Sequence, residues 1–150
     1  MDFNELDHEF RLDYTKGQLL ESQVHLDPMH QFKQWFTELV ESGVKQPNAM
    51  VLTTLDVSGF PVSRVVLLKK LDKDGFVFFT NYRSDKAVSM QAYSQVSLLF
   101  YSIEKERQIL IRGNVKKVEY SVSQSYFKSR PIESQAAALA SHQSSRVQSR

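Results

Sequence analysis

Apolar residues recur at helical spacing in one early stretch of the chain. Five of them fall on a single stripe at i, i+3, i+4, i+7 and i+8, namely Phe32, Trp35, Phe36, Leu39 and Val40. Asp27 precedes the stripe as an N-cap, Pro28 suits the first helical position, and Gly43 follows as a stop signal. The pattern predicts an amphipathic helix whose stripe, including the only Trp, packs into a core rather than against a cofactor.

From Ala49 onward the apolar pattern changes to the short runs that are typical of strands. Five runs are predicted as strands: AMVLTTLD (49–56), PVSRVVLLKK (61–70), FVFFT (76–80), QVSLLFY (95–101) and RQILIRGNVKKVE (107–119). A short helix is expected from Ser84 to about Tyr93. Most connections are turns too tight for a crossover helix, so the strands should pair antiparallel. A small closed or nearly closed barrel is favoured, because closure removes exposed strand edges.

The two ends of the chain are more polar than its middle. Residues 1–25 form an arm or a short helix that Gly17 ends, and the segment from Ser121 predicts short helices interrupted at Arg130 and Pro131. No internal repeat or linker divides residues 1–150. The sequence therefore predicts one domain, mainly β with flanking helices.

Composition narrows the class of protein. Apolar residues make up 41% and charged residues 24%, and 19 basic against 17 acidic side chains leave a net charge of +2. This balance gives no reason to expect a nucleic-acid partner. There is no cysteine, which excludes disulfides and thiolate chemistry. The acidic N-terminus is no signal peptide and no apolar run approaches the roughly 20 residues that span a bilayer. We expect a cytoplasmic protein without a membrane partner.

The usual catalytic signatures are missing from the sequence. The four histidines lack metal-ligand spacing (His8, His25, His30 and His142), and no glycine-rich nucleotide motif is present. We therefore predict no catalytic side chain and no metal site. Arg64 instead interrupts an apolar strand, where a partly buried guanidinium needs an acceptor. Lys86 stands in the first turn of the helix after Ser84, which is either a simple N-cap or part of a phosphate seat.

Six segments, taken together, resemble the pyridoxamine 5′-phosphate oxidase family. They are RLDYTKG from Arg11, RVVLLK from Arg64, FFTN followed by SDK, ERQILIRG, YFKSRPIESQ and the final SHQSSR. Each is weak alone, but all six occur in the family's order over nearly the whole chain. The resemblance implies an antiparallel FMN-binding split β-barrel that holds FMN at the interface of a homodimer.

The resemblance also implies site residues. The implied FMN contacts are Arg64, Val65, Val66, Leu67, Leu68, Lys69, Phe79, Thr80, Lys86, Gln108, Gln143 and Ser144. The implied contacts to a pyridoxamine or pyridoxine 5′-phosphate substrate are Arg11, Tyr14, Lys69, Tyr126, Arg130 and Ser134. Both ligands are aromatic rings that carry a phosphate monoester, so two separate cationic seats are chemically reasonable. The flavin would supply the redox chemistry, which explains why no acid–base pair stands out.

The chain departs from the family pattern in two places. Asp85 stands where the family has Arg, and a carboxylate beside a phosphate seat is repulsive, although Arg83 could compensate. The family also continues past SHQSSR with strands that carry a Trp near the flavin and an Arg-x-His pair at the substrate. We interpret the chain as a truncated form that lacks this C-terminal segment, and expect a homodimer with weak FMN binding and little or no oxidase activity.

Three functions are compared. The first is FMN-dependent oxidation of pyridoxamine or pyridoxine 5′-phosphate to pyridoxal 5′-phosphate, with O₂ reduced to H₂O₂. The second is a flavin- or pyridoxal-phosphate-binding module without turnover, which the missing segment favours. The third is a nucleic-acid-binding β-barrel, which the near-neutral charge and the lack of interleaved basic and aromatic residues disfavour.

Overall fold

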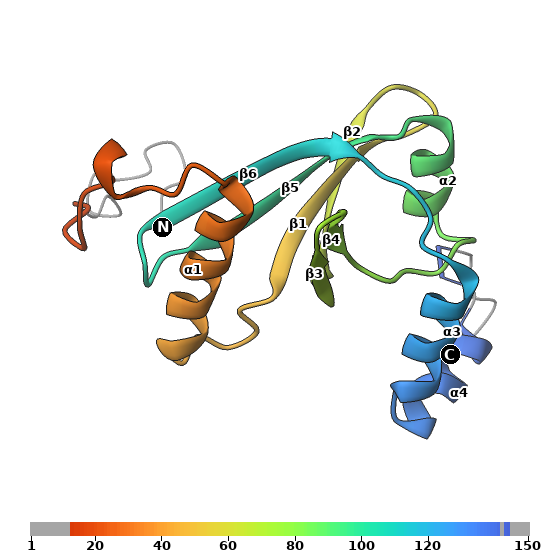
Figure 1. Ribbon diagram of the computed structural model, residues 1–150. Coiled ribbons are helices and arrows are strands. Elements are labelled where there is room, and N and C mark those ends of the chain that lie inside the picture. Colours follow the sequence, from red (N-terminus) through yellow and green to blue (C-terminus); the bar gives the residue numbers. More distant parts are fainter. Residues whose placement is uncertain (1–12, 142, 145–150) are drawn as a thin grey trace, which may run out of the picture. The chain divides into compact units, whose positions relative to one another are not determined.

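The computed structural model describes residues 13–141, 143 and 144 (Figure 1). Its helices are α1 (Pro28–Glu41), α2 (Asp85–Ala92), α3 (Tyr120–Ser129) and α4 (Ile132–Ala140), with one 3-10 turn at Glu21–Gln23. Its strands are β1 (Ala49–Leu55), β2 (Pro61–Leu67), β3 (Lys70–Asp72), β4 (Gly75–Val77), β5 (Gln95–Ser102) and β6 (Arg107–Asn114). The chain divides into two compact units, Met1–Pro47 with Tyr101–Arg107 and Asn48–Phe100 with Gln108–Arg150.

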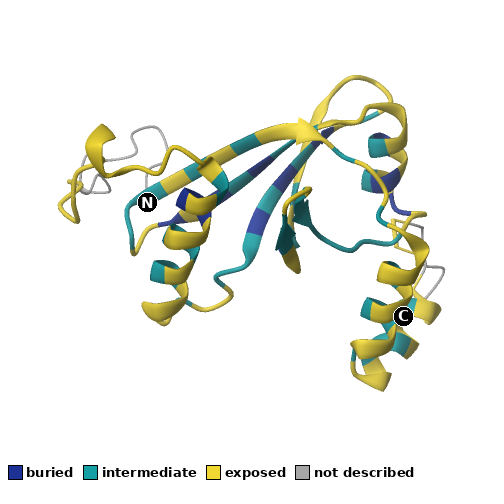
Figure 2. Ribbon diagram, viewed as in Figure 1, coloured by how far each residue is buried: buried dark blue, intermediate teal, exposed yellow. Residues whose placement is uncertain are grey.

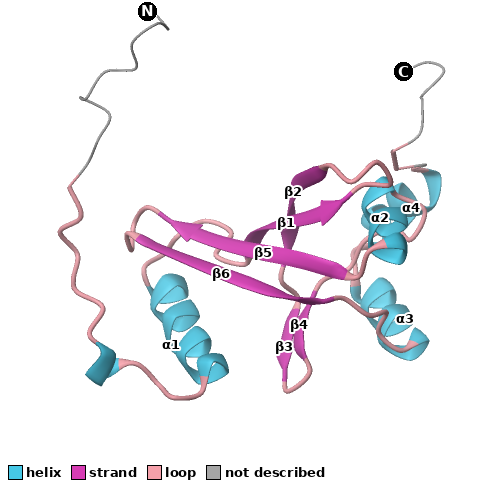
Figure 3. Ribbon diagram, turned by 90° about the horizontal axis from the view of Figure 1, so that it is seen from above, coloured by secondary structure: helices cyan, strands magenta, loops and turns pink. Residues whose placement is uncertain are grey.

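The strands form two separate sheets (Figure 3). β2, β1, β5 and β6 make a four-stranded sheet in that order, and β3 pairs with β4 in a two-stranded ribbon. β1 runs antiparallel to both β2 and β5, and β3 runs antiparallel to β4. The expected mainly β class with flanking helices and antiparallel pairing is confirmed.

The core of the second unit lies on one face of β1 and β5. Side chains alternate between the faces of a strand, and Met50, Leu52 and Thr54 are almost completely buried, at 2%, 0% and 1% exposure. Leu98 and Phe100 of β5 are buried in the same way, as the dark bands in Figure 2 show. α2 packs against β1 and buries Ala87 and Ser89. This rigid face is the support on which the site residues of β2 and α2 stand.

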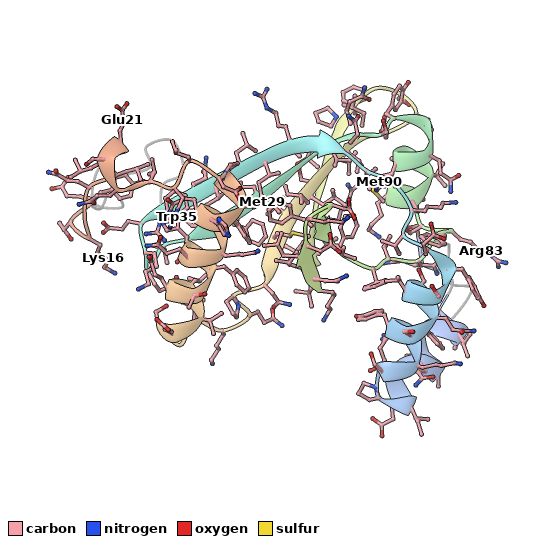
Figure 4. The ribbon with its side chains drawn as sticks, viewed as in Figure 1. Lys16, Glu21, Met29, Trp35, Arg83 and Met90 are labelled. Carbon is pink, nitrogen blue, oxygen red and sulfur yellow. The ribbon has the colours of Figure 1, made fainter. Side chains whose placement is uncertain are left out.

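In the first unit, α1 begins and ends where its capping signals predict. The Asp27 carboxylate accepts the N–H of Met29 at 2.8 Å, and Gly43 adopts a φ of +74°, which a glycine tolerates at a helix end. Phe32 is buried and stacks on Phe36, whereas Val40 at the end of the stripe is 49% exposed. The labelled Trp35 (Figure 4) lies under the Arg107 guanidinium, 4.6 Å from the ring centroid. Trp35 is therefore a packing residue of this unit.

Three of the predicted strands differ from the structure. The run 107–119 is strand only through Asn114, where β6 ends. The run 61–70 is not one strand, because the chain leaves β2 at Leu67 and starts β3 at Lys70. At the break, the Leu68 N–H bonds to the Asn48 carbonyl and the Lys69 N–H bonds to the Val77 carbonyl, each at 2.8 Å. The run 76–80 is strand only through Val77. The described part of the chain therefore has six strands, where the sequence predicted five.

Candidate functional site

A wide cleft in the second unit collects most of the predicted site residues. It has a volume of about 2120 Å³ and is lined by residues of β2–β4, α2, α3 and α4. A site for one small ligand has roughly 300–1,000 Å³, so this cleft has room for two. Its lining includes Val65, Val66, Leu67, Lys69, Phe79, Thr80, Lys86, Tyr126, Arg130, Ser134 and Gln143.

Arg64 lies beside the wall that β2 contributes to the cleft. It pairs with Leu52 in the ladder, so its side chain stands over the buried face of the sheet. Its Nη1 donates to Thr54 Oγ1 at 2.7 Å and makes a longer 3.5 Å contact with the Leu52 carbonyl. Burial lowers the pKa of Arg64, and the nearby Asp85 carboxylate acts in the opposite direction. Two neutral acceptors thus hold a half-buried guanidinium in place and leave its other N–H groups for an anion.

Lys86 lies in the first turn of α2, half-buried and close to Arg64. Burial, followed by the positive charge of Arg64, lowers the pKa of Lys86, while Asp85 raises it. Within the described ranges, neither cation forms an ion pair with a carboxylate. Two neighbouring, partly desolvated cations that form no ion pair favour binding of an anion between them.

The start of α2 is arranged differently from a simple capped helix. Ser84 occupies the N-cap position, but its hydroxyl donates to the Asn81 carbonyl at 2.7 Å and makes no capping bond. Asn81 Oδ1 in turn accepts the N–H of Arg83 at 2.8 Å. Ser84 is fully buried, so this bond holds the loop between Asn81 and Ser84 from its buried side. Ser84 is therefore the N-cap of α2 by position, but its hydroxyl does not cap the helix because it bonds back to its own loop.

Asp85 stands at the seat, as the sequence comparison with the family suggested. Its charge acts on both Arg64 and Lys86, and its N–H donates to Ser144 Oγ at 3.3 Å. Arg83 is exposed, and Figure 4 shows its side chain projecting outward from the ribbon. The carboxylate therefore reduces the positive potential of the seat, and among the described residues Arg83 forms no ion pair with it.

Lys69, Phe79 and Tyr126 lie close to one another in the lining of the cleft. The rings of Phe79 and Tyr126 are parallel within 4° and have centroids 3.8 Å apart. The Lys69 Nζ lies 5.8 Å from the centroid of the Tyr126 ring. Phe79 follows β4 and Tyr126 belongs to α3, so this stack joins the cofactor set to the substrate set predicted from the sequence.

Arg130 and Ser134 lie at the corner between α3 and α4. Arg130 has extended backbone, as expected of a residue before proline, and ends α3. The Gln135 side chain donates to the carbonyls of Arg130 at 2.8 Å and Lys128 at 3.3 Å. Both helices bury no residue, and Figure 2 shows them without a dark band. Gln135 therefore holds the corner that carries Arg130 on two otherwise exposed helices.

Several predicted residues lie elsewhere. Leu68 is buried behind the cleft at 6% exposure, and Ser144 contacts Asp85 as described. Gln108 is exposed on β6, one residue before Ile109 in a strand whose Ile111 lines the cleft. Side chains alternate, so Gln108 lies on the opposite face of the sheet. Tyr14 belongs to the first unit and is 82% exposed. Arg11, His8 and His142 lie outside the described residues.

Sequence reasoning missed the residues that hold the site residues in place. Thr54 fixes Arg64, Asn48 fixes the backbone at Leu68 through two bonds, and Gln135 fixes the corner at Arg130. The role of Thr54 could have been predicted from the sequence, because the predicted hairpin places Thr54 diagonally opposite Arg64. Asn48 and Gln135 follow only from the fold.

The described residues contain neither a cluster of metal ligands nor a membrane-spanning helix. No group of three or more His, Asp or Glu side chains there is arranged to hold a metal ion. No helix in the described ranges is long and apolar enough to cross a membrane.

Known proteins with similar sequences belong to the family that the sequence motifs resemble. The family model described as pyridoxamine 5′-phosphate oxidase matches residues 36–150. A Thermosynechococcus vestitus protein named pyridoxine/pyridoxamine 5′-phosphate oxidase is 46% identical over 136 residues, which cover 91% of this chain and 64% of the relative. A Legionella pneumophila protein of the same name is 45% identical over 139 residues, covering 93% and 65%. The chain thus spans about two thirds of the length of these relatives.

Two solved structures share the fold. PhzG from Burkholderia lata, in complex with tetrahydrophenazine-1-carboxylic acid, has a TM-score of 0.83 and 27% identity, covering 89% of this chain and 67% of PhzG. An FMN-binding protein related to pyridoxamine 5′-phosphate oxidase, from Nostoc punctiforme, has a TM-score of 0.56 and 17% identity, covering 71% of this chain and 60% of its own. The second likeness bears on the fold alone. The family model and the identities of about 45% over most of the chain show that this chain belongs to the pyridoxamine 5′-phosphate oxidase family.

Proposed function

We propose that the chain binds FMN and, beside it, pyridoxamine or pyridoxine 5′-phosphate, and oxidises that substrate to pyridoxal 5′-phosphate. The observation that carries the proposal is the pair Arg64 and Lys86, two half-buried cations at one cleft with no carboxylate partner among the described residues. A phosphate monoester offers the charge and the oxygen acceptors that this pair lacks. The family name of the relatives supports the same ligand class.

The residues present fit FMN. Arg64 and Lys86 would hold its phosphate, and Val66, Leu67 and Thr80 border the cleft where an isoalloxazine ring would lie. When bound, FMN would accept a hydride from the substrate carbon and pass the two electrons to O₂, which yields H₂O₂. The protein's part is to bind and orient the two ligands, which agrees with the lack of an acid–base pair in the predicted site.

The substrate phosphate would be held by Tyr126, Arg130 and Ser134. A planar guanidinium with two hydroxyl partners suits three phosphate oxygens. Lys69 lies near Tyr126 at the link between the two sheets, where it would contact both ligands. Orientation of the substrate over the flavin by these contacts accounts for several kcal/mol of barrier in such reactions, roughly 7–11 at the upper limit.

The same chain would act as a homodimer. Gln108 lies on the sheet face opposite the cleft, so its family role at the flavin is possible only in the site of a second copy. That face also exposes Leu110 at 58%. Covering such an apolar side chain favours association.

The test separates binding from turnover. FMN is titrated into the purified chain and followed by flavin absorbance and fluorescence, and pyridoxine 5′-phosphate is then added without oxygen. Binding followed by loss of the flavin absorbance, and peroxide release after air is admitted, is the expected result. Binding of FMN and pyridoxal 5′-phosphate without peroxide would leave the binding module as the function. A chain that takes up no FMN would refute both, and sedimentation with and without FMN tests the dimer.

A further inference from the structure

One carboxylate in the first unit holds two backbone groups that lie far away in the sequence. The Oε2 atom of Glu106 accepts the N–H of Thr15 at 2.7 Å and the N–H of Lys16 at 2.8 Å. Lys16 adds a third bond from its Nζ to the Glu104 carbonyl at 2.9 Å. The turn between β5 and β6 therefore fastens the chain at residues 15 and 16.

These three bonds attach residues 13–17 to the turn between β5 and β6. Residues 13–20 form no helix or strand, and within the described chain these three hydrogen bonds join residues 13–17 to the rest of the protein. Bonds to an ionised carboxylate are about twice as strong as neutral ones. Tyr14, the next residue outward, is 82% exposed, so its position depends on the attachment of Thr15 and not on packing of its ring.

The backbone of Glu106 points to a role for its side chain. Glu106 has a φ of +49°, in the left-handed region that is unfavourable for a residue with a Cβ and where Gly or Asn is usual. The turn itself would be served better by glycine. What the glutamate adds is the carboxylate, and that carboxylate is engaged by Thr15 and Lys16.

We infer that Glu106 is a positioning residue that anchors the segment at residues 15 and 16 and so restricts the positions that Tyr14 can take when a substrate binds. The inference rests on the proposed function and on the family resemblance, which implies that Tyr14 contacts the substrate. A segment that is attached at its base loses less conformational freedom when it closes over a ligand than a free one does. The carboxylate thereby favours ligand binding without touching the ligand.

The first measurement of the test does not depend on any ligand. Trypsin cleavage after Lys16 is followed by mass spectrometry for the unaltered 150-residue chain, Glu106→Ala, Glu106→Gly and the control Glu104→Gln. Loss of two charge-assisted bonds should raise the rate of cleavage after Lys16 about tenfold in both Glu106 variants, since cleavage follows the population of the detached segment. Glu106→Gly keeps or relaxes the turn, so faster cleavage there cannot come from a damaged turn.

Glu104→Gln is the matched control, because it removes the same charge from the same turn. The backbone carbonyl that accepts from Lys16 remains, and the amide oxygen can still accept from Ser102, as the carboxylate does at 3.2 Å. Its cleavage rate should equal that of the unaltered chain. Equal rates for Glu106→Ala and Glu104→Gln would overturn the attachment.

The second measurement is ligand binding. Glu106→Gly should weaken pyridoxal 5′-phosphate binding to the FMN-loaded chain roughly fivefold and leave the FMN Kd unchanged, and Glu106→Gln, which keeps an oxygen acceptor, should recover most of the loss. Unchanged pyridoxal 5′-phosphate binding in a variant that is cleaved faster would overturn the positioning role. If the unaltered chain binds neither ligand, the proposed function fails and the positioning role with it, while the cleavage rates still decide on the attachment.

Discussion

The two cationic sets at the cleft are built in different ways. Arg64 and Lys86 stand on β2 and α2, next to the buried side chains of β1, and a buried threonine holds the guanidinium. Arg130 and Ser134 stand on α3 and α4, which bury no residue and are held by one glutamine at their corner and by the Phe79–Tyr126 stack.

This difference indicates which of the two sets keeps its geometry before a ligand binds. Desolvated cations on a packed sheet keep their geometry without an anion, and binding one relieves the electrostatic cost of their burial. Side chains on two exposed helices must be ordered by the ligand, which costs part of the binding energy. We therefore expect a rigid FMN seat and an adaptable substrate seat.

Removal of Arg64 should have the largest effect. Arg64→Ala removes a charge-assisted contact worth roughly 1.5–3 kcal/mol, so the FMN Kd should rise about tenfold or more. Lys86→Ala should act in the same direction with a smaller change, because lysine offers a single point of charge. FMN titration followed by fluorescence measures both, with exposed Lys128→Ala as the control. An unchanged FMN Kd in both variants would show that Arg64 and Lys86 do not bind the FMN phosphate.

Removal of Arg130 should discriminate between two forms of the ligand. Arg130→Ala should weaken pyridoxal 5′-phosphate binding roughly fivefold to tenfold and leave unphosphorylated pyridoxal nearly unaffected, since only the phosphate contacts the guanidinium. The FMN Kd should not change if the two seats are independent. Equal losses for the two ligands would show that Arg130 is not the phosphate partner.

Reversal of the charge at Asp85 should strengthen FMN binding, in contrast to the losses expected above. Asp85→Arg removes a carboxylate whose charge acts on Arg64 and Lys86, so FMN should bind several-fold more tightly, by about 1 kcal/mol. The gain should be greater at low salt, where charges are least screened. Glu133→Arg, the same change in the first turn of α4, is the control. Weaker or unchanged FMN binding would mean that Asp85 does not oppose the ligand.

The smallest effect is expected at the contact that joins the two sets. Phe79→Leu removes a parallel ring pair worth roughly 0.5–1.5 kcal/mol, so Tyr126 should be held less firmly and pyridoxal 5′-phosphate should bind about threefold more weakly. Its neighbour Phe78, which also lines the cleft, gives the control Phe78→Leu. Equal effects of the two variants on pyridoxal 5′-phosphate binding would contradict a specific role for the stack.

Local signals along the chain sufficed for much of the fold. Asp27, Pro28 and Gly43 mark the ends of α1 because capping depends on residues within one turn. Pro131 separates α3 from α4 for a similarly local reason, since its ring disfavours helix at Arg130. The first hairpin follows from its turn, where the Asp56 carboxylate accepts the N–H groups of Ser58 and Phe60.

The sequence also predicted which residues line the cleft better than it predicted where the strands around the cleft end. The set that resembles the family's site contributes eleven residues to the cleft lining, although their roles there remain predictions. It did not predict the end of β2 at Leu67, because the bonds that redirect the chain come from Asn48 and Val77. A strand ends where its partners end, and partners are chosen by the whole sheet.

By itself, the sequence determined where helices and turns begin and that a family's phosphate-binding side chains are present in order. Only the tertiary structure decided that Thr54 holds Arg64, that Phe79 stacks on Tyr126 and that Glu106 holds residues 15 and 16. The physical reason is range. Capping and turn preferences act between near neighbours, whereas a buried guanidinium, a ring or a carboxylate is satisfied by whichever group the folded chain brings within hydrogen-bonding or van der Waals distance.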